Sequence, residues 1–498
     1  MKRGYVLVID QGTTGTTMLV MAENGEVKHR FYQAFAQSYP KPGWVEHDPG
    51  LIWQTVVCGL KEILSLSWIN PEEIKAIGIT NQRETTVIWD RRTGRPVYPA
   101  IVWQCRRTAD KCQQLQEDGC QDLIRKKTGL IIDAYFSGSK IHWILENVPG
   151  VRERANRGEL AFGTIDSWLI WNLTGGKSHV TDYSNASRTM LFNINNLEWD
   201  EELMQLLSIP PSLMPEVRPS AGLFGQTDPE LTIKALPILG VLGDQQAALF
   251  GHGCLERGMM KNTYGTGCFL LMNTGEKPFI TESGLLASVA WGLNGKVHYA
   301  LEGSVFMGGA IIQWLRDELG LLRTASESEA MAMAVPDTNG VYFVPAFTGL
   351  GAPHWDPYAR GSLQGLTRGA NRNHIVRAAL EGIAYQVGEL IQSMAGATGT
   401  TLTELRVDGG AAANNFLLQF QANLSKLNIL RNSSVELTGI GAAYITGLTA
   451  GLWSDLHALQ ALVSLERTFI PQNDEEAREK CWAGWRRAVE RAKNWAVE

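Results

Sequence analysis

Three apolar stretches of this chain end in an aspartate that lies beside glycine. They are Tyr5–Asp10, followed by Gln11-Gly12; Leu236–Asp244, which contains Gly243; and Leu405–Asp408, followed by Gly409-Gly410. A short apolar run bounded by turn residues is typical of a buried strand. Two of the three runs lie in the first half of the chain and one lies near its end. This spacing suggests two related lobes that face a cleft.

Strand and helix patterns alternate along the chain. Further strands are expected at 18–21, 26–31, 74–80, 85–89 and 97–103, and helices are expected at 49–64, 247–253, 375–394, from 414, and at 478–495. Asp48-Pro49 is typical of a helix start, with an N-cap followed by proline in the first turn. The alternation predicts an α/β architecture, and 498 residues suit about two to four domains.

Composition excludes several classes of protein. The formal net charge of -6 argues against a general nucleic-acid binder. Seven cysteines without a CxxC pair fit a reducing cytoplasm, with Cys105, Cys112 and Cys120 as ordinary thiols. The apolar run Tyr5–Ile9 is too short for a signal peptide, and no run is long enough to span a membrane. The sequence therefore predicts a cytoplasmic protein without a membrane span.

The segment Asp10–Thr17 carries the first chemical signal. Gly12 and Gly15 allow close approach of the backbone to a phosphate, while threonine hydroxyls and backbone N–H groups can donate to its oxygens. Asp10 could hold hydrated Mg²⁺. The segment is not a P-loop or a Rossmann fingerprint, since it leads into a strand. Taken alone, it is equally compatible with a polar hairpin turn.

Two later turns add to this signal. Gly265-Thr266-Gly267 offers a second phosphate-binding turn, and Gly409–Asn414 offers a small-residue surface for a flat base. Glu46-His47-Asp48 superficially suggests a metal site, but Asp48-Pro49 favours a helix cap. Each turn is a weak signal alone; their order along the chain is the stronger one.

Longer sequence segments around these turns, which occur in the same order, resemble the FGGY carbohydrate kinases of the actin-like ATPase fold, and among them the branch that acts on glycerol. The matching segments are Tyr39–Pro49, Gly78–Thr86, Ile101–Arg107, Gly243–Phe250, Asn262–Cys268 and Pro345–Pro353. The resemblance covers nearly the whole chain. It implies an α/β fold with two ribonuclease-H-like domains flanking a deep catalytic cleft: residues 1–252 for the polyol and the phosphate loop, and residues 253–498 for the nucleotide.

The resemblance also implies an activity, the ATP-dependent phosphorylation of glycerol to sn-glycerol 3-phosphate with Mg²⁺. Asp244 would orient the acceptor hydroxyl and take its proton, although its place before a helix is also compatible with a capping role. The implied polyol site contains Arg83, Glu84, Trp103, Tyr135, Asp244, Gln245 and Phe269. The implied nucleotide contacts are Thr13, Thr14, Gly15, Thr266, Gly309, Gln313, Gly410 and Asn414, with Asp10 at the metal.

The chain departs from the family pattern in its phosphate loop. The family usually carries a basic residue where this chain has Thr17, and a small hydroxyl residue where it has Gly15. An uncompensated loss of one such charge would cost about 2–4 kcal/mol in the transition state. The sequence therefore predicts weaker transfer or poorer ATP affinity than in close relatives.

Two regulatory features of some bacterial relatives are also missing. Gln226–Leu239 has no Gly-Gly-Thr-Arg word for fructose 1,6-bisphosphate, and Ser220–Gly225 has no histidine for the phosphotransferase system. Neither form of control is expected. The family suggests a homodimer or homotetramer. Two alternatives stay open: a kinase of another small polyol or sugar, and a degenerate member that binds glycerol or ATP with weak or no catalysis.

Overall fold

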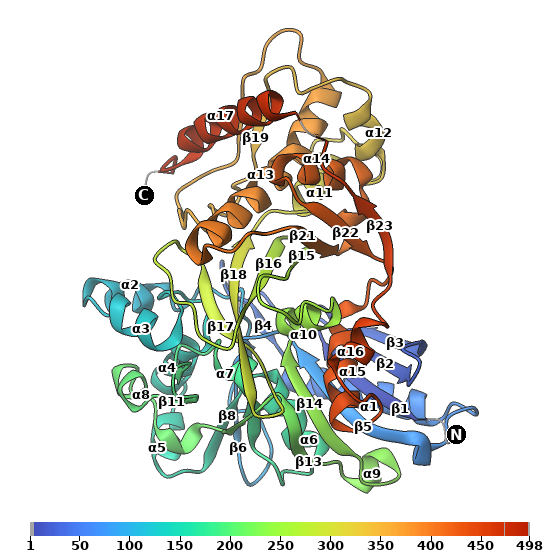
Figure 1. The fold of residues 1–498 in the computed structure, drawn as a ribbon. Helices are drawn as coiled ribbons and strands as arrows, with labels where there is room; N and C mark the ends of the chain where they lie inside the picture. The colour runs from blue at the N-terminus through green and yellow to red at the C-terminus, as the bar shows by residue number, and fades with distance from the viewer. Residues whose placement is uncertain (1–3, 473, 497–498) are drawn as a thin grey trace.

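The computed structural model describes residues 4–472 and 474–496 and consists of two lobes, each built on one large mixed sheet (Figure 1). The sheet of the first lobe has six strands in the order β13-β14-β5-β1-β2-β3. Their bounds are β1 Tyr5–Gln11, β2 Gly15–Ala22, β3 Val27–Ala34, β5 Ile74–Asn81, β13 Ala221–Gln226 and β14 Pro237–Gly243.

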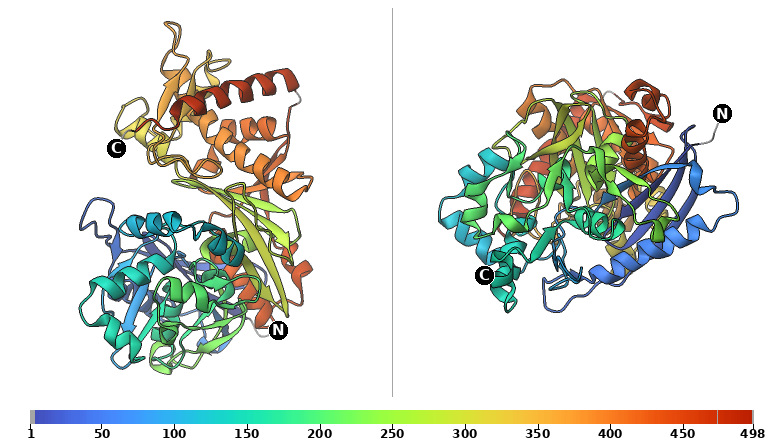
Figure 2. Two further views of the ribbon diagram at one scale, coloured as in Figure 1. Left: turned by 90° about the vertical axis from the view of Figure 1, so that its left-hand side faces the viewer. Right: turned by 90° about the horizontal axis from the view of Figure 1, so that it is seen from below.

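The sheet of the second lobe has seven strands in the order β17-β18-β16-β15-β21-β22-β23. Their bounds are β15 Met260–Tyr264, β16 Cys268–Gly275, β17 Leu286–Leu293, β18 Lys296–Val305, β21 Glu404–Asp408, β22 Asn428–Asn432 and β23 Leu465–Phe469. Figure 2 shows from two further sides that this sheet lies beside the first lobe and reaches toward it through β17 and β18.

The two sheets share a pattern of strand directions. In the first, β2 runs antiparallel between β1 and β3, while β1, β5 and β14 run parallel. In the second, β16 runs antiparallel between β15 and β18, while β15, β21 and β22 run parallel. The two related lobes that the strand-end aspartates predicted are therefore present, and the two-lobed α/β fold is confirmed.

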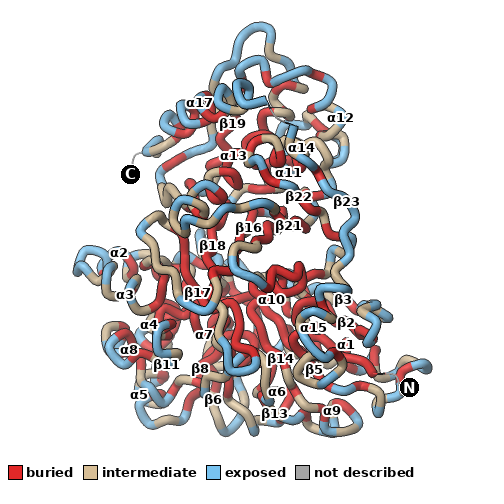
Figure 3. Tube along the Cα trace, in the orientation of Figure 1, coloured by how far each residue is buried: buried red, intermediate tan, exposed pale blue. Residues whose placement is uncertain are grey.

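Strand β1 explains how a continuous apolar run is used. Val6 and Val8 pack on one face of the sheet against the helices α10 and α15, and Leu7 and Ile9 pack on the other face in the cluster that includes residues of α1 and α6. All four side chains are fully buried. Figure 3 shows that the trace of this lobe around β5 and β14 is likewise mostly buried. A sheet covered by helices on both faces requires this pattern, since neither side of the strand meets water.

The helices and the shorter strands complete the two lobes. The helices are α1 Pro49–Leu64, α2 Ala109–Glu117, α3 Gln121–Thr128, α4 Ser137–Asn147, α5 Val151–Asn156, α6 Ile165–Leu173, α7 Tyr183–Ala186, α8 Glu201–Leu206, α9 Pro229–Thr232, α10 Asp244–Gly251, α11 Ala310–Asp317, α12 Glu327–Met333, α13 Arg372–Thr398, α14 Asn415–Ser425, α15 Leu437–Thr449, α16 Leu456–Gln460 and α17 Glu475–Ala492. Five two-stranded pairs are formed by β4 Glu46–His47 with β7 Ala100–Ile101, β6 Val87–Asp90 with β8 Leu160–Gly163, β9 Val180–Asp182 with β12 Glu216–Arg218, β10 Phe192–Asn193 with β11 Glu198–Trp199, and β19 Tyr342–Val344 with β20 Ser362–Gln364.

Helix α15 crosses the division that the sequence predicts. It lies in the chain between β22 and β23 of the second sheet, yet it packs on β1, β5 and β14 of the first sheet and against α10. A boundary at 252/253 would assign α15 to the second domain by sequence number, whereas its apolar contacts lie in the first lobe. The boundary itself stays a prediction.

Most of the predicted elements are present, and three differ. Asp48 caps α1 by accepting a hydrogen bond from the Gly50 N–H at 2.7 Å, which confirms the cap interpretation. The helix predicted from 247 begins at Asp244, directly after β14. The strand predicted at 97–103 is only Ala100–Ile101, because Pro99 has no N–H to donate to a ladder, and the strand predicted from 85 begins at Val87.

Two further findings bear on the exclusions drawn from composition. All seven cysteines lie among the described residues, and each is a free thiol. In the described part of the chain, no helix is both long and apolar enough to cross a membrane.

Candidate active site

The site begins where parallel strands of the first sheet end. Asp10 lies near the carboxyl end of β1 and Asp244 directly follows β14, with β5 between these two strands. Burial, together with the negative charges of Asp244 and Glu436, raises the pKa of Asp10 to about 8. A buried carboxyl whose charged form is disfavoured by neighbouring carboxylates creates a place that favours a cation.

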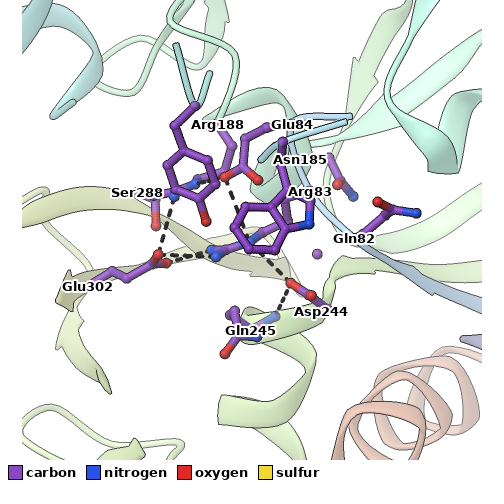
Figure 4. Close-up of polar contacts among 12 residues, drawn as sticks. Gln82, Arg83, Glu84, Asn185, Arg188, Asp244, Gln245, Ser288 and Glu302 are labelled. Carbon is purple, nitrogen blue, oxygen red and sulfur yellow. Dashed lines mark hydrogen bonds and ion pairs between the residues drawn. The ribbon is translucent and has the colours of Figure 1, made fainter. Parts of the chain in front are cut away.

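Arg83 joins Asp244 to the second lobe (Figure 4). Its Nε lies 3.2 Å from Oδ1 of Asp244, and its two terminal nitrogens donate to the carboxylate of Glu302 on β18 at 2.5 and 3.1 Å. Burial raises the pKa of Asp244, and the Arg83 charge opposes that shift. The carboxylate is therefore a stronger proton acceptor than a free aspartate, and one of its oxygens is held in place.

A second arginine completes a buried ionic network. Arg188, two residues after the end of α7, donates from Nε to Glu84 at 2.6 Å and from a terminal nitrogen to Glu302 at 3.2 Å. Arg83, Arg188, Glu84 and Glu302 are all buried. Despite its burial, Glu302 has its pKa lowered to about 2 by the two arginines. The network thus fixes the side chains of Arg83 and Glu84 before any ligand binds.

Glu84 has a strained backbone. Its φ is 60°, in the left-handed region that residues other than glycine rarely adopt. Such strain costs on the order of 1–3 kcal/mol and is found where surrounding contacts enforce a functional geometry. Here the Arg188 pair and a hydrogen bond from Ser137 Oγ to the Glu84 carbonyl, at 3.0 Å, hold the residue in place.

Aromatic side chains from both lobes meet beside this network. The Trp103 ring packs edge-on against Tyr135 at a centroid distance of 5.6 Å and against Phe269 of β16 at 6.5 Å. Burial raises the pKa of Tyr135, so its hydroxyl stays protonated and can donate. Trp103 Nε1 also donates to Thr13 Oγ1 at 3.0 Å, which links the aromatic wall to the first glycine-rich turn.

The two glycine-rich turns occupy equivalent places in the two sheets. Gly12–Gly15 joins β1 to β2 through a 2.9 Å hydrogen bond from Gly12 N–H to the Gly15 carbonyl. Gly265–Gly267 joins β15 to β16 with the corresponding bond, also 2.9 Å. Thr14 is exposed and Thr13 is half-buried. Each lobe therefore presents a tight polar turn at the same edge of its sheet.

The predicted nucleotide residues of the second lobe gather around its turn. Gly309 precedes α11 and donates from its N–H to the Gly265 carbonyl at 2.8 Å, while Gln313 lies one helical turn further along. A Cβ on Gly309 would lie 3.6 Å from that of Ala411, which places the Gly410 turn beside it. Asn414 caps α14 and donates to Ser328 Oγ at 3.1 Å. Around Gly410 a side chain would meet nothing within 4 Å.

The absence of a side chain at Gly15 has a steric reason. A Cβ there would lie 2.7 Å from the Tyr32 ring and 2.8 Å from the Gln33 carbonyl oxygen. Gly15→Ala is therefore expected to lower the free energy of unfolding by about 1–3 kcal/mol. Gly396→Ala is the control, because its Cβ would meet nothing within 4 Å inside α13. Thermal denaturation measures both; an unchanged melting temperature for Gly15→Ala would contradict the close contact with Tyr32.

A buried polar cluster lies behind Asp244. Lys261 of β15 donates to Gln245 Oε1 at 2.5 Å and to Thr263 Oγ1 at 3.0 Å. Asp408, the third strand-end aspartate, lies 3.5 Å from His252 Nε2. Burial lowers the pKa of Lys261 to about 8. Gln245, predicted as a polyol contact, thus uses its carbonyl oxygen for Lys261, which leaves its amide N–H₂ for other partners.

Sequence reasoning missed Glu302, Arg188 and Lys261. A signal exists for Glu302, since it is the only charged residue between Tyr299 and Val305 in an apolar strand, and a charge in such a run needs a buried partner. Arg188 stands alone in the same way between Ala186 and Leu191. The pairing of these charges with Arg83 and Glu84 could not be deduced, because the partners are more than 100 residues apart in sequence.

No metal centre forms around Glu46-His47-Asp48. Within residues 4–472 and 474–496, no three His, Cys, Asp or Glu side chains gather into a group that could hold a metal ion. Glu46 accepts hydrogen bonds from Arg107 at 2.7 Å and from Tyr98 at 2.8 Å.

Comparison with known proteins defines the class. Residues 5–251 match the N-terminal domain of the FGGY family of carbohydrate kinases, and residues 260–450 match its C-terminal domain. The chain therefore belongs to the FGGY family of carbohydrate kinases, which confirms the resemblance seen in its sequence.

Several relatives within this family carry the same name. Glycerol kinase of Carboxydothermus hydrogenoformans is 57% identical over 499 residues, with 100% of each chain covered. Glycerol kinase 2 of Thermotoga maritima is 55% identical, with 99% of each chain covered. A solved structure of Plasmodium falciparum glycerol kinase with ADP has a TM-score of 0.93 and 38% identity, and it covers 98% of each chain.

Proposed function

We propose that this protein transfers the γ-phosphoryl group of ATP to a terminal hydroxyl of glycerol, giving sn-glycerol 3-phosphate and ADP. The observation that carries the proposal is the Asp244 carboxylate, 3.2 Å from Arg83 and anchored through it to Glu302. The close relatives named above, each called glycerol kinase, support glycerol as the acceptor.

In this proposal a small polyol binds between the ionic network and the aromatic wall. Arg83 donates to one hydroxyl and Glu84 accepts from another, since a guanidinium only donates and a carboxylate only accepts. Trp103 and Phe269 cover the carbon edge. Tyr135 and the amide of Gln245 supply further hydrogen bonds.

The nucleotide binds across the two glycine-rich turns. Thr13, Thr14 and the backbone at Gly15 donate to its phosphates from the first lobe, and Thr266 donates from the second. Gly309, Gln313, Gly410 and Asn414 surround the sugar and base, where the open space around Gly410 suits a flat ring. Asp10 would hold Mg²⁺, which prefers carboxylate, water and phosphate oxygens and would neutralise charge on the transferred group.

Asp244 then orients the acceptor hydroxyl in line with the γ-phosphorus. The hydroxyl oxygen forms the new P–O bond, the bond to the β-phosphate oxygen breaks, and Asp244 takes the hydroxyl proton. Phosphoryl transfer depends more on position and charge than on base strength. The fixed Arg83–Asp244 pair suits this requirement.

Purified protein supplied with MgATP is expected to release ADP only when glycerol is present. Phosphorus NMR should identify sn-glycerol 3-phosphate, and kcat/KM for glycerol should exceed that for xylulose or gluconate by at least about 100-fold. Turnover with one of those sugars instead would favour a different acceptor. Glycerol binding without turnover would favour the degenerate binding protein.

Several sequence predictions stay proposals beside this one. They are the domain boundary at 252/253, a homodimer or homotetramer, the cytoplasmic location, and the absence of control by fructose 1,6-bisphosphate or the phosphotransferase system.

A further inference from the structure

The mouth of the proposed nucleotide site has an excess of negative charge. The negative charges of Asp244 and Glu436 both act on the Asp10 carboxyl. A bound triphosphate would add several more negative charges, which need nearby cations to be stabilised. The loop Gln11–Thr17 contains no lysine or arginine. The positive charge on this side of the site must therefore come from another element.

The strand register points to β3. Asp10 lies opposite Thr17 on β2, and Thr17 lies opposite Tyr32 on β3. Directly opposite residues in antiparallel strands share a face, as do alternate residues along a strand. Arg30, two residues from Tyr32, therefore lies on the face of Asp10 and Thr17. The positive charge of Arg30 is thus close enough to act on the Asp10 carboxyl.

Contacts hold Arg30 next to the loop. Its guanidinium lies 5.4 Å from the centre of the Tyr32 ring, and its Nε lies 2.5 Å from Glu436 Oε1 before α15. The Tyr32 ring in turn occupies the space that a side chain at Gly15 would take. The side chain of Arg30 is 47% exposed, so it has room to turn toward a ligand.

We propose that Arg30, carried on Tyr32 over Gly15, supplies the positive charge for the nucleotide phosphates that position 17 lacks in this chain. The inference rests on the proposed function and adds a specific nucleotide-binding residue to it. The inference also connects the two positions at which this loop differs from the family pattern. Gly15 leaves room for the Tyr32 ring, and Arg30 supplies the charge that is absent at Thr17. Glu436 holds Arg30 until the phosphates arrive.

Calorimetric titration with the Mg²⁺ complex of a non-hydrolysable ATP analogue tests this directly. Arg30→Gln should weaken binding of the analogue on the order of tenfold, as expected for loss of one charged hydrogen bond, and leave glycerol binding unchanged. Lys28→Gln is the control, since it removes the same charge from the same strand further from Asp10. Adding Thr17→Arg to Arg30→Gln should restore affinity to within about threefold of the unmodified protein.

Glu436→Gln separates a charge effect from a structural one. This variant loses the same ion pair between Arg30 of β3 and Glu436 before α15, but it removes a negative charge. Affinity for the ATP analogue should therefore stay the same or rise. Equal losses in Glu436→Gln and Arg30→Gln, or a loss that Thr17→Arg does not restore, would show that Arg30 only braces α15. An Arg30→Gln protein that behaves like Lys28→Gln would also overturn the inference. If the unmodified protein fails to bind the analogue at all, the proposed function fails instead.

Discussion

Replacing Asp244 by asparagine is expected to lower kcat for glycerol phosphorylation by about 10²- to 10⁴-fold, the range that general acid–base catalysis supplies. Asparagine keeps the shape of the side chain and can still contact Arg83 through its carbonyl oxygen, but it cannot take the hydroxyl proton. Glycerol should therefore still bind, within about tenfold of its affinity for the unmodified protein. Steady-state kinetics and equilibrium titration with glycerol measure the two quantities separately.

The control for this variant is Asp317→Asn. Asp317 also pairs with an arginine, since Arg316 Nε lies 2.6 Å from its Oδ1, but it is exposed at the end of α11. The Asp317→Asn variant should change kcat by less than about twofold.

The pH profile gives a second check on the role of Asp244. In the unmodified enzyme kcat/KM should fall as acid protonates Asp244, whose pKa is raised by burial, and this acidic limb should be absent from Asp244→Asn. Retention of more than a tenth of kcat by Asp244→Asn would contradict its assignment as the base.

The strand-end aspartates were predictable because their signal is local. Continuous apolar runs at Tyr5–Ile9 and Leu236–Gly243 become strands buried on both faces, and the polar residue that follows each run must then lie at the sheet edge. Gly12 and Gly265, together with their neighbouring residues, likewise predict tight turns. Local sequence therefore predicted the two sheets, their turns and all three strand-end aspartates, Asp408 of β21 included.

The ionic network was not predictable, because nothing local specifies it. Arg83 and Glu302 are separated by 219 positions, and their pairing requires β18 of the second lobe to lie against the first lobe. The position of α15 could not be predicted from the sequence for the same reason. Its apolar sequence fits either sheet, and only the folded structure shows that it packs on β1. The helix start at Asp244 was missed because Asp244, Gln245 and Gln246 were assigned to the end of the preceding strand.

Replacing Glu302 by glutamine is expected to lower the free energy of unfolding by about 3–5 kcal/mol, the cost of removing one partner from a buried ion pair. Glu302 is fully buried and accepts hydrogen bonds from Arg83 at 2.5 and 3.1 Å and from Arg188 at 3.2 Å. Glutamine has the same shape but no charge, so two buried guanidinium groups lose the carboxylate that they share. Denaturant-induced unfolding of the variant and the parent measures the difference.

Glu404→Gln is the matched control. Glu404 also pairs with an arginine, Arg406, at 3.1 Å, but its side chain is 31% exposed, so its loss should cost less than about 1 kcal/mol. A comparable small loss for Glu302→Gln would mean that the buried network does not hold the lobes. Adding Arg188→Met to Glu302→Gln should recover part of the stability, since it removes the excess buried positive charge that Glu302→Gln leaves beside Glu84.

The pH dependence separates the charge of Glu302 from its packing. Its pKa is lowered from 4.5 to about 2, so it contributes stability that is fully present above about pH 4.5 and is lost as the pH falls toward 2. The difference in the free energy of unfolding between the parent and Glu302→Gln should therefore narrow over that interval, whereas a difference caused by packing would stay constant.

Because Glu302 comes from β18 and Arg83 from the first lobe, loss of the Glu302 charge should also weaken glycerol binding. A variant that loses stability but binds glycerol normally would show that the network braces the lobes without orienting Arg83 for the substrate.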